Sequence, residues 1–187
     1  KLYKKFCPGP ITFVLRKKNK SKIQSSVTAK LNTVAIRFPS HKTARSVLKK
    51  INFPLAMPSA NLSSGISPVS ALDVSEEFKN KIKIIINSGN SKIGIESTVV
   101  SLIGKPKILR PGIIGAKTIK KFLKISIIKN SSKISSPGML KKHYSPGIPV
   151  LLNKKMADKG CALITFGKKY KKKTNYFNLS KKSDLKE

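Results

Sequence analysis

The stretch P-L-A-M-P-S-A-N-L-S-S-G-I-S-P, residues 54–68, carries no charge, although the 187-residue chain contains 40 lysines and arginines. It holds four serines, one asparagine, one glycine and three prolines. Its apolar start, Pro54 to Met57, predicts a short strand, and Ser67-Pro68 predicts a helix start with serine as the N-cap. Hydroxyl groups and helix N-termini donate hydrogen bonds to anions. We therefore expect this neutral loop to shape a site for a specific small ligand.

Predicted strands and helices alternate on both sides of this stretch. Runs rich in β-branched and aromatic residues indicate strands, and spaced apolar residues indicate helices. The predicted strands cover Ile11–Arg16, Thr33–Phe38, Pro54–Met57, Lys83–Asn87, Ser97–Ile103, Lys107–Leu109, Val150–Leu152 and Cys161–Phe166. The predicted helices are one that ends before the turn Pro8-Gly9-Pro10, one over His41–Ile51 capped by Ser40, one over Ser67–Asn80 that buries Leu72 and Phe78, and one over Ile114–Lys124.

A hairpin interrupts the alternation, because the turn Gly104-Lys105-Pro106 joins two predicted strands. This favours an α/β fold with a twisted, mixed parallel and antiparallel sheet and flanking helices. The composition changes near residue 125. We expect a main domain over residues 1–124, a Ser/Lys-rich linker over 125–149, and the start of a small second α/β domain over 150–187.

The formal net charge of +33 has two interpretations. It is typical of proteins that bind nucleic acid or another polyanion. It is also what a general compositional bias towards lysine produces, because only Arg16, Arg37, Arg45 and Arg110 are arginines. Two isolated cysteines without metal-ligand spacing indicate a reducing, cytoplasmic setting. No apolar run approaches the roughly 20 residues that span a bilayer.

Several kinds of chemistry are not favoured. The chain has neither a phosphate-binding Gly-x-x-x-x-Gly-Lys-[Ser/Thr] loop nor a Gly-x-Gly-x-x-Gly loop, and no His/Cys metal cluster. Only seven acidic residues are present, which argues against a hydrolase with paired carboxylates. His41 and His143 are the only histidines, and neither has an evident acidic partner for a catalytic triad.

What remains is a set of hydroxyl, amide and arginine side chains near predicted strand ends. Its members are Thr12, Arg16, Arg37, His41, Ser59, Asn61, Ser67, Glu96 to Thr98, and Arg110. Such groups suit an anionic ligand, because arginine holds phosphate or carboxylate bidentately. We expect transfer between bound substrates, promoted by positioning and electrostatics.

Each of these residues also has a purely structural explanation. Thr12 fits a strand because it is β-branched, Arg16 and Arg37 could be structural ion-pair partners, and Arg110 could be a charge at the edge of the hairpin. Ser59 and Asn61 could form turns by bonding their own backbone. Glu96 could pair with a lysine.

Five blocks, taken together, resemble the signatures of the YrdC family of threonylcarbamoyl-AMP synthases. They are K-x-F-C-P-G-P-I-T-F-V-L, V-A-I-R-F-P-S-H, the stretch 54–68, G-I-E-S-T-V-V and I-L-R-P-G-I-I, in this order. The resemblance covers roughly residues 1–124. A sixth block, S-P-G-M-x-x-x-H-Y-x-P, is similar to the linker of the two-domain form.

The resemblance implies a reaction of L-threonine, bicarbonate and ATP that gives L-threonylcarbamoyl-AMP and pyrophosphate, with Mg²⁺ on the phosphates. The product would feed a downstream threonylcarbamoyl transferase complex, which modifies tRNA next to the anticodon. The family pattern places Thr12, Ser59, Asn61, Ser67, Arg110 and Tyr144 at ATP, and Arg16, Met57 and Ser97 at threonine. Arg37, His41 and His143 are further possible contacts.

Two departures from the family pattern are visible. A segment with a Lys-x-Arg motif is expected before Lys1, and the second domain is short, so the chain resembles an internal fragment whose own activity is in doubt. The alternatives are an RNA-binding module of the same fold and the carbamoyl-transfer domain of hydrogenase-maturation proteins. The intact hydroxyl and arginine set argues against the first, and the linker block argues against the second.

Overall fold

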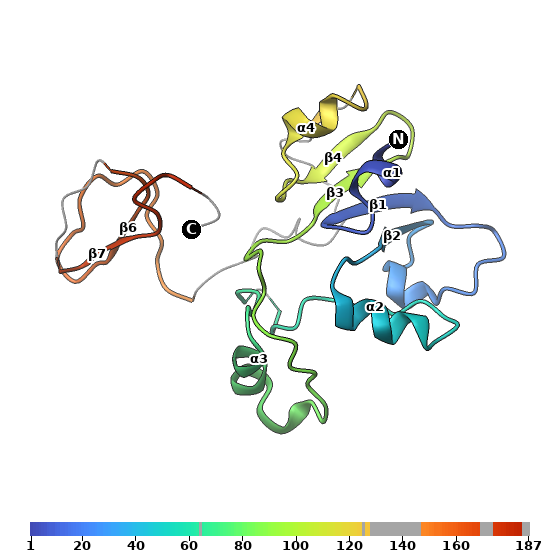
Figure 1. Cartoon of the computed structure of the whole chain (residues 1–187), viewed down its shortest axis with the longest axis horizontal. Coiled ribbons are helices and arrows are strands. Elements are labelled where there is room, and N and C mark those ends of the chain that lie inside the picture. The colour runs from blue at the N-terminus through green and yellow to red at the C-terminus, as the bar shows by residue number, and fades with distance from the viewer. Residues whose placement is uncertain (64, 125, 128–146, 169–173, 185–187) are drawn as a thin grey trace. The chain divides into compact units, whose positions relative to one another are not determined.

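The computed structural model of this chain describes residues 1–63, 65–124, 126–127, 147–168 and 174–184. The chain divides into two compact units, residues 1–145 and 146–187 (Figure 1). The predicted linker over residues 125–149 lies largely outside the described residues, so the predicted domain boundaries stay a prediction.

The first unit is built around a five-stranded sheet in the order β2-β1-β3-β4-β5 (Figure 1). β1 pairs with β2 antiparallel and with β3 parallel, whereas β3 pairs with β4 antiparallel and β4 with β5 parallel. The strands are β1 (Ile11–Arg16), β2 (Thr33–Arg37), β3 (Thr98–Ser101), β4 (Lys107–Arg110) and β5 (Ser126–Ile127). The predicted mixed sheet is therefore confirmed, and so is the predicted hairpin, which is the β3–β4 pair.

The two faces of the sheet differ because side chains alternate along each strand. In β1, Ile11 and Phe13 are buried on one face, whereas Thr12 and Arg16 lie on the other. The first face packs against α1 (Leu2–Phe6) and α4 (Ala116–Lys120), which Figure 1 shows on the same side of the sheet. The buried core there consists of Leu2, Ile11, Phe13, Val100, Ile108 and Ile119.

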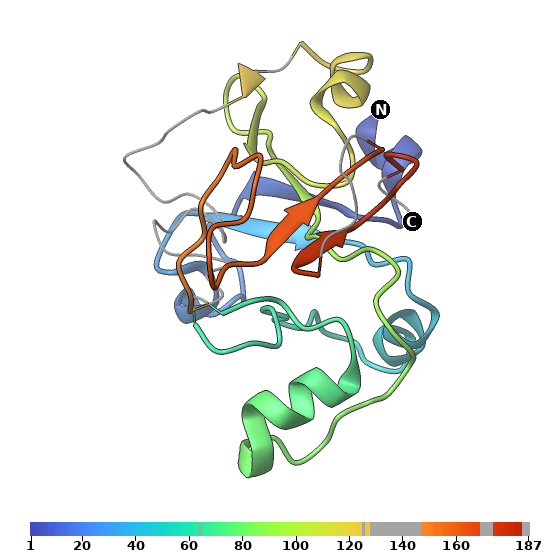
Figure 2. The ribbon, with the colours of Figure 1, turned by 90° about the vertical axis from the view of Figure 1, so that its left-hand side faces the viewer.

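Two further helices, α2 (Lys42–Lys49) and α3 (Ala71–Phe78), lie on the opposite side of the sheet from α1 and α4 (Figures 1 and 2). His41, not the predicted Ser40, occupies the N-cap position of α2, and its side chain makes no capping hydrogen bond. Two short 3₁₀ helices, Ser25–Thr28 and Lys79–Lys81, complete the unit.

The predicted start of α3 at Ser67 is wrong by three residues. Ser70 is the N-cap: its Oγ accepts from the Asp73 backbone N–H at 3.1 Å, and Asp73 Oδ2 accepts from the Ser70 N–H at 3.0 Å. This reciprocal capping box satisfies two backbone donors at once, which a serine followed by proline does not.

Two predicted strands of this unit are irregular segments instead, Pro54–Met57 and Lys83–Asn87. An apolar run favours burial, but a strand also needs a partner for its backbone hydrogen bonds. No described strand pairs with either segment, and Ile84 and Ile86 are 80% and 62% exposed. Leu72, which was predicted to be buried in α3, is also exposed.

The second unit contains a parallel pair of short strands, β6 (Leu163–Thr165) and β7 (Tyr176–Asn178). The predicted strand Cys161–Phe166 contains β6. The predicted strand Val150–Leu152 is wrong, because this segment is irregular and its side chains are exposed.

Within the described ranges, no helix combines the length and the apolar character that crossing a membrane requires. Both cysteines are free thiols; Cys7 is partly buried and Cys161 is exposed.

Candidate functional site

Four neighbouring strands place a row of residues on the sheet face opposite the α1–α4 core. Arg37 of β2 lies opposite Thr12 of β1, Thr12 lies beside Val99 of β3, and Val99 lies opposite Arg110 of β4. Residues in register on neighbouring strands share a face. The row therefore brings two arginines and a threonine together from positions far apart in the chain.

Ser97, directly before β3, connects Thr12 and Arg110 of this row. It is only 5% exposed. Its Oγ lies 2.6 Å from Thr12 Oγ1, and Arg110 Nη2 donates to the same oxygen at 3.2 Å. Arg110 Nε and Nη2 also donate to the Ser97 backbone oxygen, at 3.2 and 3.0 Å. Among the described residues Arg110 Nη1 has no hydrogen-bond partner, so its donors are available to an anion.

Gly112 holds the Ser97 backbone in place by a close approach. A Cβ at Gly112 would lie 2.5 Å from both the Glu96 oxygen and the Thr98 nitrogen. Next to this contact, Thr98 Oγ1 donates to the Ile114 oxygen at 2.9 Å and accepts from the Ile114 N–H at 3.1 Å. The segment after β4 therefore locks the position of Ser97, and only glycine fits at position 112.

Arg37 adds a second positive charge. Its Nε donates to the Gly9 oxygen at 3.2 Å, and the Gly9 N–H donates to the Phe38 oxygen at 2.8 Å, so the end of β2 is tied to the Pro8-Gly9-Pro10 turn. Partial burial of the guanidinium, and after it the charge of Arg110, lowers the pKa of Arg37, although the residue as a whole is exposed. Two arginines that repel each other across hydroxyl groups favour an anion between them.

The neutral stretch, residues 54–68, is connected to this row by Ser67. Ser67 Oγ donates to Glu96 Oε1 at 2.5 Å, and Glu96 directly precedes Ser97. Asn61 behaves differently: its Nδ2 donates to the Leu62 oxygen at 2.7 Å and to the Gly65 oxygen at 3.3 Å. Its amide nitrogen is therefore engaged within its own loop, in the turn-forming role that the sequence allowed, whereas its amide oxygen Oδ1 is buried without a hydrogen-bond partner among the described residues.

The other predicted site residues are less closely connected. Arg16 lies at the exposed end of β1, on the same face as Thr12. Met57, 69% exposed, ends the irregular segment Pro54–Met57, and Ser59 follows it. Among the described residues, no side-chain hydrogen bond joins these three residues to Ser97. His41 is exposed at the start of α2, and the predicted contacts His143 and Tyr144 lie outside the described residues.

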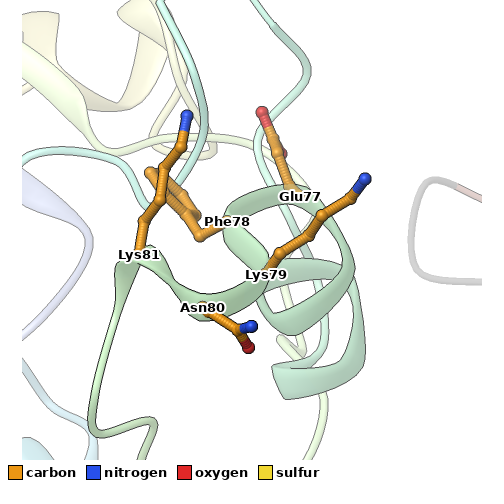
Figure 3. A pocket seen from close by; sticks show the side chains of 5 residues that line it. All are labelled: Glu77, Phe78, Lys79, Asn80 and Lys81. Carbon is orange, nitrogen blue, oxygen red and sulfur yellow. The ribbon is translucent and has the colours of Figure 1, made fainter.

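A hollow of about 570 Å³ lies elsewhere, at the end of α3. Figure 3 shows its lining, which consists of Glu77, Phe78, Lys79, Asn80 and Lys81. All five are consecutive in the chain, so the hollow is the surface of one helix end rather than a cleft between elements. We therefore place the candidate site at the row and not at this hollow.

Sequence reasoning missed three residues that organise the site: Ser70, Glu77 and Gly112. The capping box had a signal, because Ser-Ala-Leu-Asp at 70–73 has the required spacing. Gly112 stands directly after Arg110-Pro111, but its close approach involves a remote segment. Glu77 accepts from the Leu62 N–H at 2.6 Å, a contact over 15 positions that no local pattern predicts.

A sheet face that gathers hydroxyl groups and arginines has the donors that a small anionic ligand requires. Among the described residues, no group of three His, Cys, Asp or Glu side chains could hold a metal ion by itself.

Two family models together match almost the whole chain. Residues 1–112 match the Sua5/YciO/YrdC model, described as telomere recombination, and residues 114–187 match the threonylcarbamoyl-AMP synthase C-terminal domain. The chain therefore belongs to the Sua5/YciO/YrdC family, which confirms the resemblance seen in the sequence.

Relatives and a solved structure support this assignment. The threonylcarbamoyl-AMP synthase of Pyrococcus abyssi is 39% identical over 165 residues, which cover 84% of this chain and 48% of the relative. That of Bacillus subtilis is 39% identical over 157 residues, with 81% and 45% covered. The crystal structure of P. abyssi Sua5 complexed with L-threonine is similar with a TM-score of 0.73 and 36% identity, covering 89% of this chain and 46% of that one. The chain spans about half the length of the relatives it matches.

Proposed function

We propose that this protein is a threonylcarbamoyl-AMP synthase, which converts L-threonine, bicarbonate and ATP into L-threonylcarbamoyladenylate, pyrophosphate and water. The observation that carries the proposal is the contact set of Thr12, Ser97 and Arg110 on one sheet face of a chain that belongs to this family. The reaction needs positioned donors for a carboxylate and a triphosphate rather than a protein nucleophile, and this set supplies them.

In this proposal the arginines and hydroxyls divide between two substrates. Thr12 and Arg110 contact ATP, with Ser59, Asn61, Ser67 and Tyr144 around the nucleotide. Arg16, Met57 and Ser97 contact threonine. Because Ser97 hydrogen-bonds both Thr12 and Arg110, the two substrates would meet beside it. The carboxylate formed on the threonine nitrogen would then lie next to the phosphate that it attacks.

Magnesium fits this site as a companion of ATP. Mg²⁺ is usually held by substrate phosphates and one or two carboxylates rather than by a protein cage. The hydroxyls and guanidinium groups of the row are donors for phosphate oxygens, not ligands for a bare cation. When bound, the ion would neutralise triphosphate charge, while Arg110 and Thr12 would orient the phosphates.

We further propose that the protein acts in the cytoplasm, that its product passes to a downstream threonylcarbamoyl transferase for tRNA modification, and that a basic surface contacts RNA. The exposed side of α2 supports the last point. Lys42, Arg45 and Lys49 lie along it at helical spacing, next to Ser46, in a chain with a net charge of +33.

The test of the enzymatic proposal is pyrophosphate exchange into ATP by the full-length protein, which should require both threonine and bicarbonate. Arg110→Ala should reduce the exchange. Lys107→Ala removes another cation of β4 and should leave it unchanged. An absence of exchange in the wild-type protein, together with tight, salt-sensitive binding of duplex RNA, would replace the synthase proposal by that of an RNA-binding module.

A further inference from the structure

Carboxylates are scarce in this chain, and three of its seven acidic residues hold one loop. The loop consists of the described residues 61–63 and 65–70. Asp73 Oδ2 accepts from the backbone N–H groups of Val69 and Ser70, Glu96 Oε1 accepts from the Ser67 hydroxyl, and Glu77 Oε1 accepts from the Leu62 N–H. Of the three, Glu77 reaches furthest into the neutral stretch.

Glu77 and Asn61 hold the two sides of Leu62. The Leu62 N–H donates to Glu77 Oε1 at 2.6 Å, and the Leu62 oxygen accepts from Asn61 Nδ2 at 2.7 Å and from the Gly65 N–H at 3.0 Å. Gly65 lies close to the same carboxylate, since a Cβ there would lie 3.3 Å from Glu77 Oε1. The loop therefore folds around the end of the Glu77 side chain.

Packing contributes little to the position of this loop. Its three large apolar side chains, Leu62, Ile66 and Val69, are 48%, 57% and 45% exposed. A loop that buries so little apolar surface depends on its hydrogen bonds for a defined conformation. A hydrogen bond to a carboxylate is about twice as strong as one between neutral groups.

The Glu77 carboxylate contacts this backbone N–H group rather than a cation. Among the described residues it forms no ion pair, although Lys79 and Lys81 follow it closely in the chain. In Figure 3 its carboxylate points away from Asn80, which leaves the helix end in the opposite direction. The neighbouring Glu76 is exposed, and its side chain makes no hydrogen bond or ion pair with described residues, so it is a matched control.

We propose that Glu77 is a positioning residue, whose carboxylate sets the conformation of the Asn61–Ser70 loop and thereby places the loop's polar side chains at the nucleotide. This inference rests on the proposed function, because it assigns the loop to the ATP site. Glu77 itself does not touch substrate. It acts through Leu62 and Asn61, as a supporting group holds the residues that do.

The kinetic test compares Glu77→Ala, Glu77→Gln and Glu76→Ala in the full-length protein. Glu77→Ala removes the acceptor and should raise the KM for ATP about tenfold with kcat changed less than about twofold, because uniform binding is lost. Glu77→Gln keeps a carbonyl oxygen for the Leu62 N–H and should stay within about threefold of the wild type. Glu76→Ala should leave both parameters unchanged.

A second measurement follows amide hydrogen exchange at Leu62, which needs no enzymatic activity. Exchange should accelerate at least tenfold in Glu77→Ala and stay at the wild-type rate in Glu76→Ala. Unchanged exchange in Glu77→Ala shows that the carboxylate does not hold the loop and overturns the proposal. Faster exchange with an unchanged KM for ATP overturns the positioning role, and so does a Glu77→Gln variant as impaired as Glu77→Ala.

The two proposals fail in different ways. A wild-type protein without threonine-dependent exchange of pyrophosphate refutes the proposed function, and with it the assignment of the loop to ATP. The Leu62 exchange rates would still decide whether Glu77 holds the loop.

Discussion

Gly112→Ala should both destabilise the protein and disturb its candidate site. The added Cβ would lie 2.5 Å from the Glu96 oxygen and the Thr98 nitrogen, and 2.8 Å from the Ser97 carbonyl carbon. Ordinary contact begins near 3.4 Å, so the two backbone segments must separate by about 0.9 Å. All three are backbone atoms, so none is the end of a flexible side chain that could turn away.

The magnitude follows from what this separation breaks. Overpacking a tight contact costs about 1–3 kcal/mol. The separation also stretches the two reciprocal hydrogen bonds between Thr98 and Ile114, each with a net contribution of about 1 kcal/mol. We therefore expect a loss of about 2–4 kcal/mol in the free energy of unfolding, since the two effects overlap. Displacement of Ser97 should also weaken ATP binding, because Ser97 hydrogen-bonds Thr12 and Arg110, which are assigned to ATP.

The assay is urea unfolding of the full-length variant, followed by calorimetric titration with ATP below the unfolding transition. Gly94→Ala is the matched control, because a Cβ at Gly94 meets no atom within 4 Å. If Gly112→Ala unfolds within about 0.5 kcal/mol of Gly94→Ala and binds ATP equally well, the close approach does not hold Ser97, and the reasoning is refuted.

Three further changes probe the same unit. Arg110→Ala should weaken ATP binding by about 1.5–3 kcal/mol, the range for a hydrogen bond to a charged group; calorimetry that finds a folded variant with unchanged affinity would contradict the phosphate contact. Thr12→Val keeps the side-chain shape but removes the hydroxyl partner of Ser97, so the buried Ser97 hydroxyl loses one hydrogen bond. The free energy of unfolding should therefore fall by about 1–3 kcal/mol. A variant as stable as the wild type in urea would show that this contact contributes nothing. Hydrogen bonds, above all from the Val69 backbone N–H, lower the pKa of Asp73 below its unfolded value of about 3.9. The stabilisation of the folded protein by ionised Asp73 is therefore complete above that pH and is lost as the pH falls through the folded-state pKa. The difference in urea midpoint between wild type and Asp73→Asn should therefore be constant at neutral pH and shrink below about pH 4; a difference that persists at pH 3 would argue against this linkage.

The central strands could be predicted because each carries its own signal. β1 alternates buried Ile11 and Phe13 with polar Thr12, and β3 is a β-branched run next to a glycine turn. These patterns depend on neighbouring residues, and the sheet confirms them. The segment Lys83–Asn87 carries an equally apolar pattern but forms no strand, because an apolar pattern does not supply a partner strand.

The candidate site was predicted as a set of residue types and not as an arrangement. Hydroxyls and arginines at strand ends identified Thr12, Ser97 and Arg110, and the family resemblance assigned them to substrates. The residues that hold the Asn61–Ser70 loop in place could not be identified from residue types or from the family resemblance. Ser70 displaced Ser67 as the helix cap because of its reciprocal contact with Asp73, and Glu77 was not singled out at all.

By itself, the sequence determined the mixed α/β character, the hairpin at Gly104, the family, and the kinds of side chain available for an anionic ligand. These are properties of local pattern and composition. Only the tertiary structure decided that Ser97 lies 2.6 Å from Thr12, 85 positions away, and that Arg110 holds the same serine. The reason is that strand order and register, rather than any local preference, decide which distant side chains share a face.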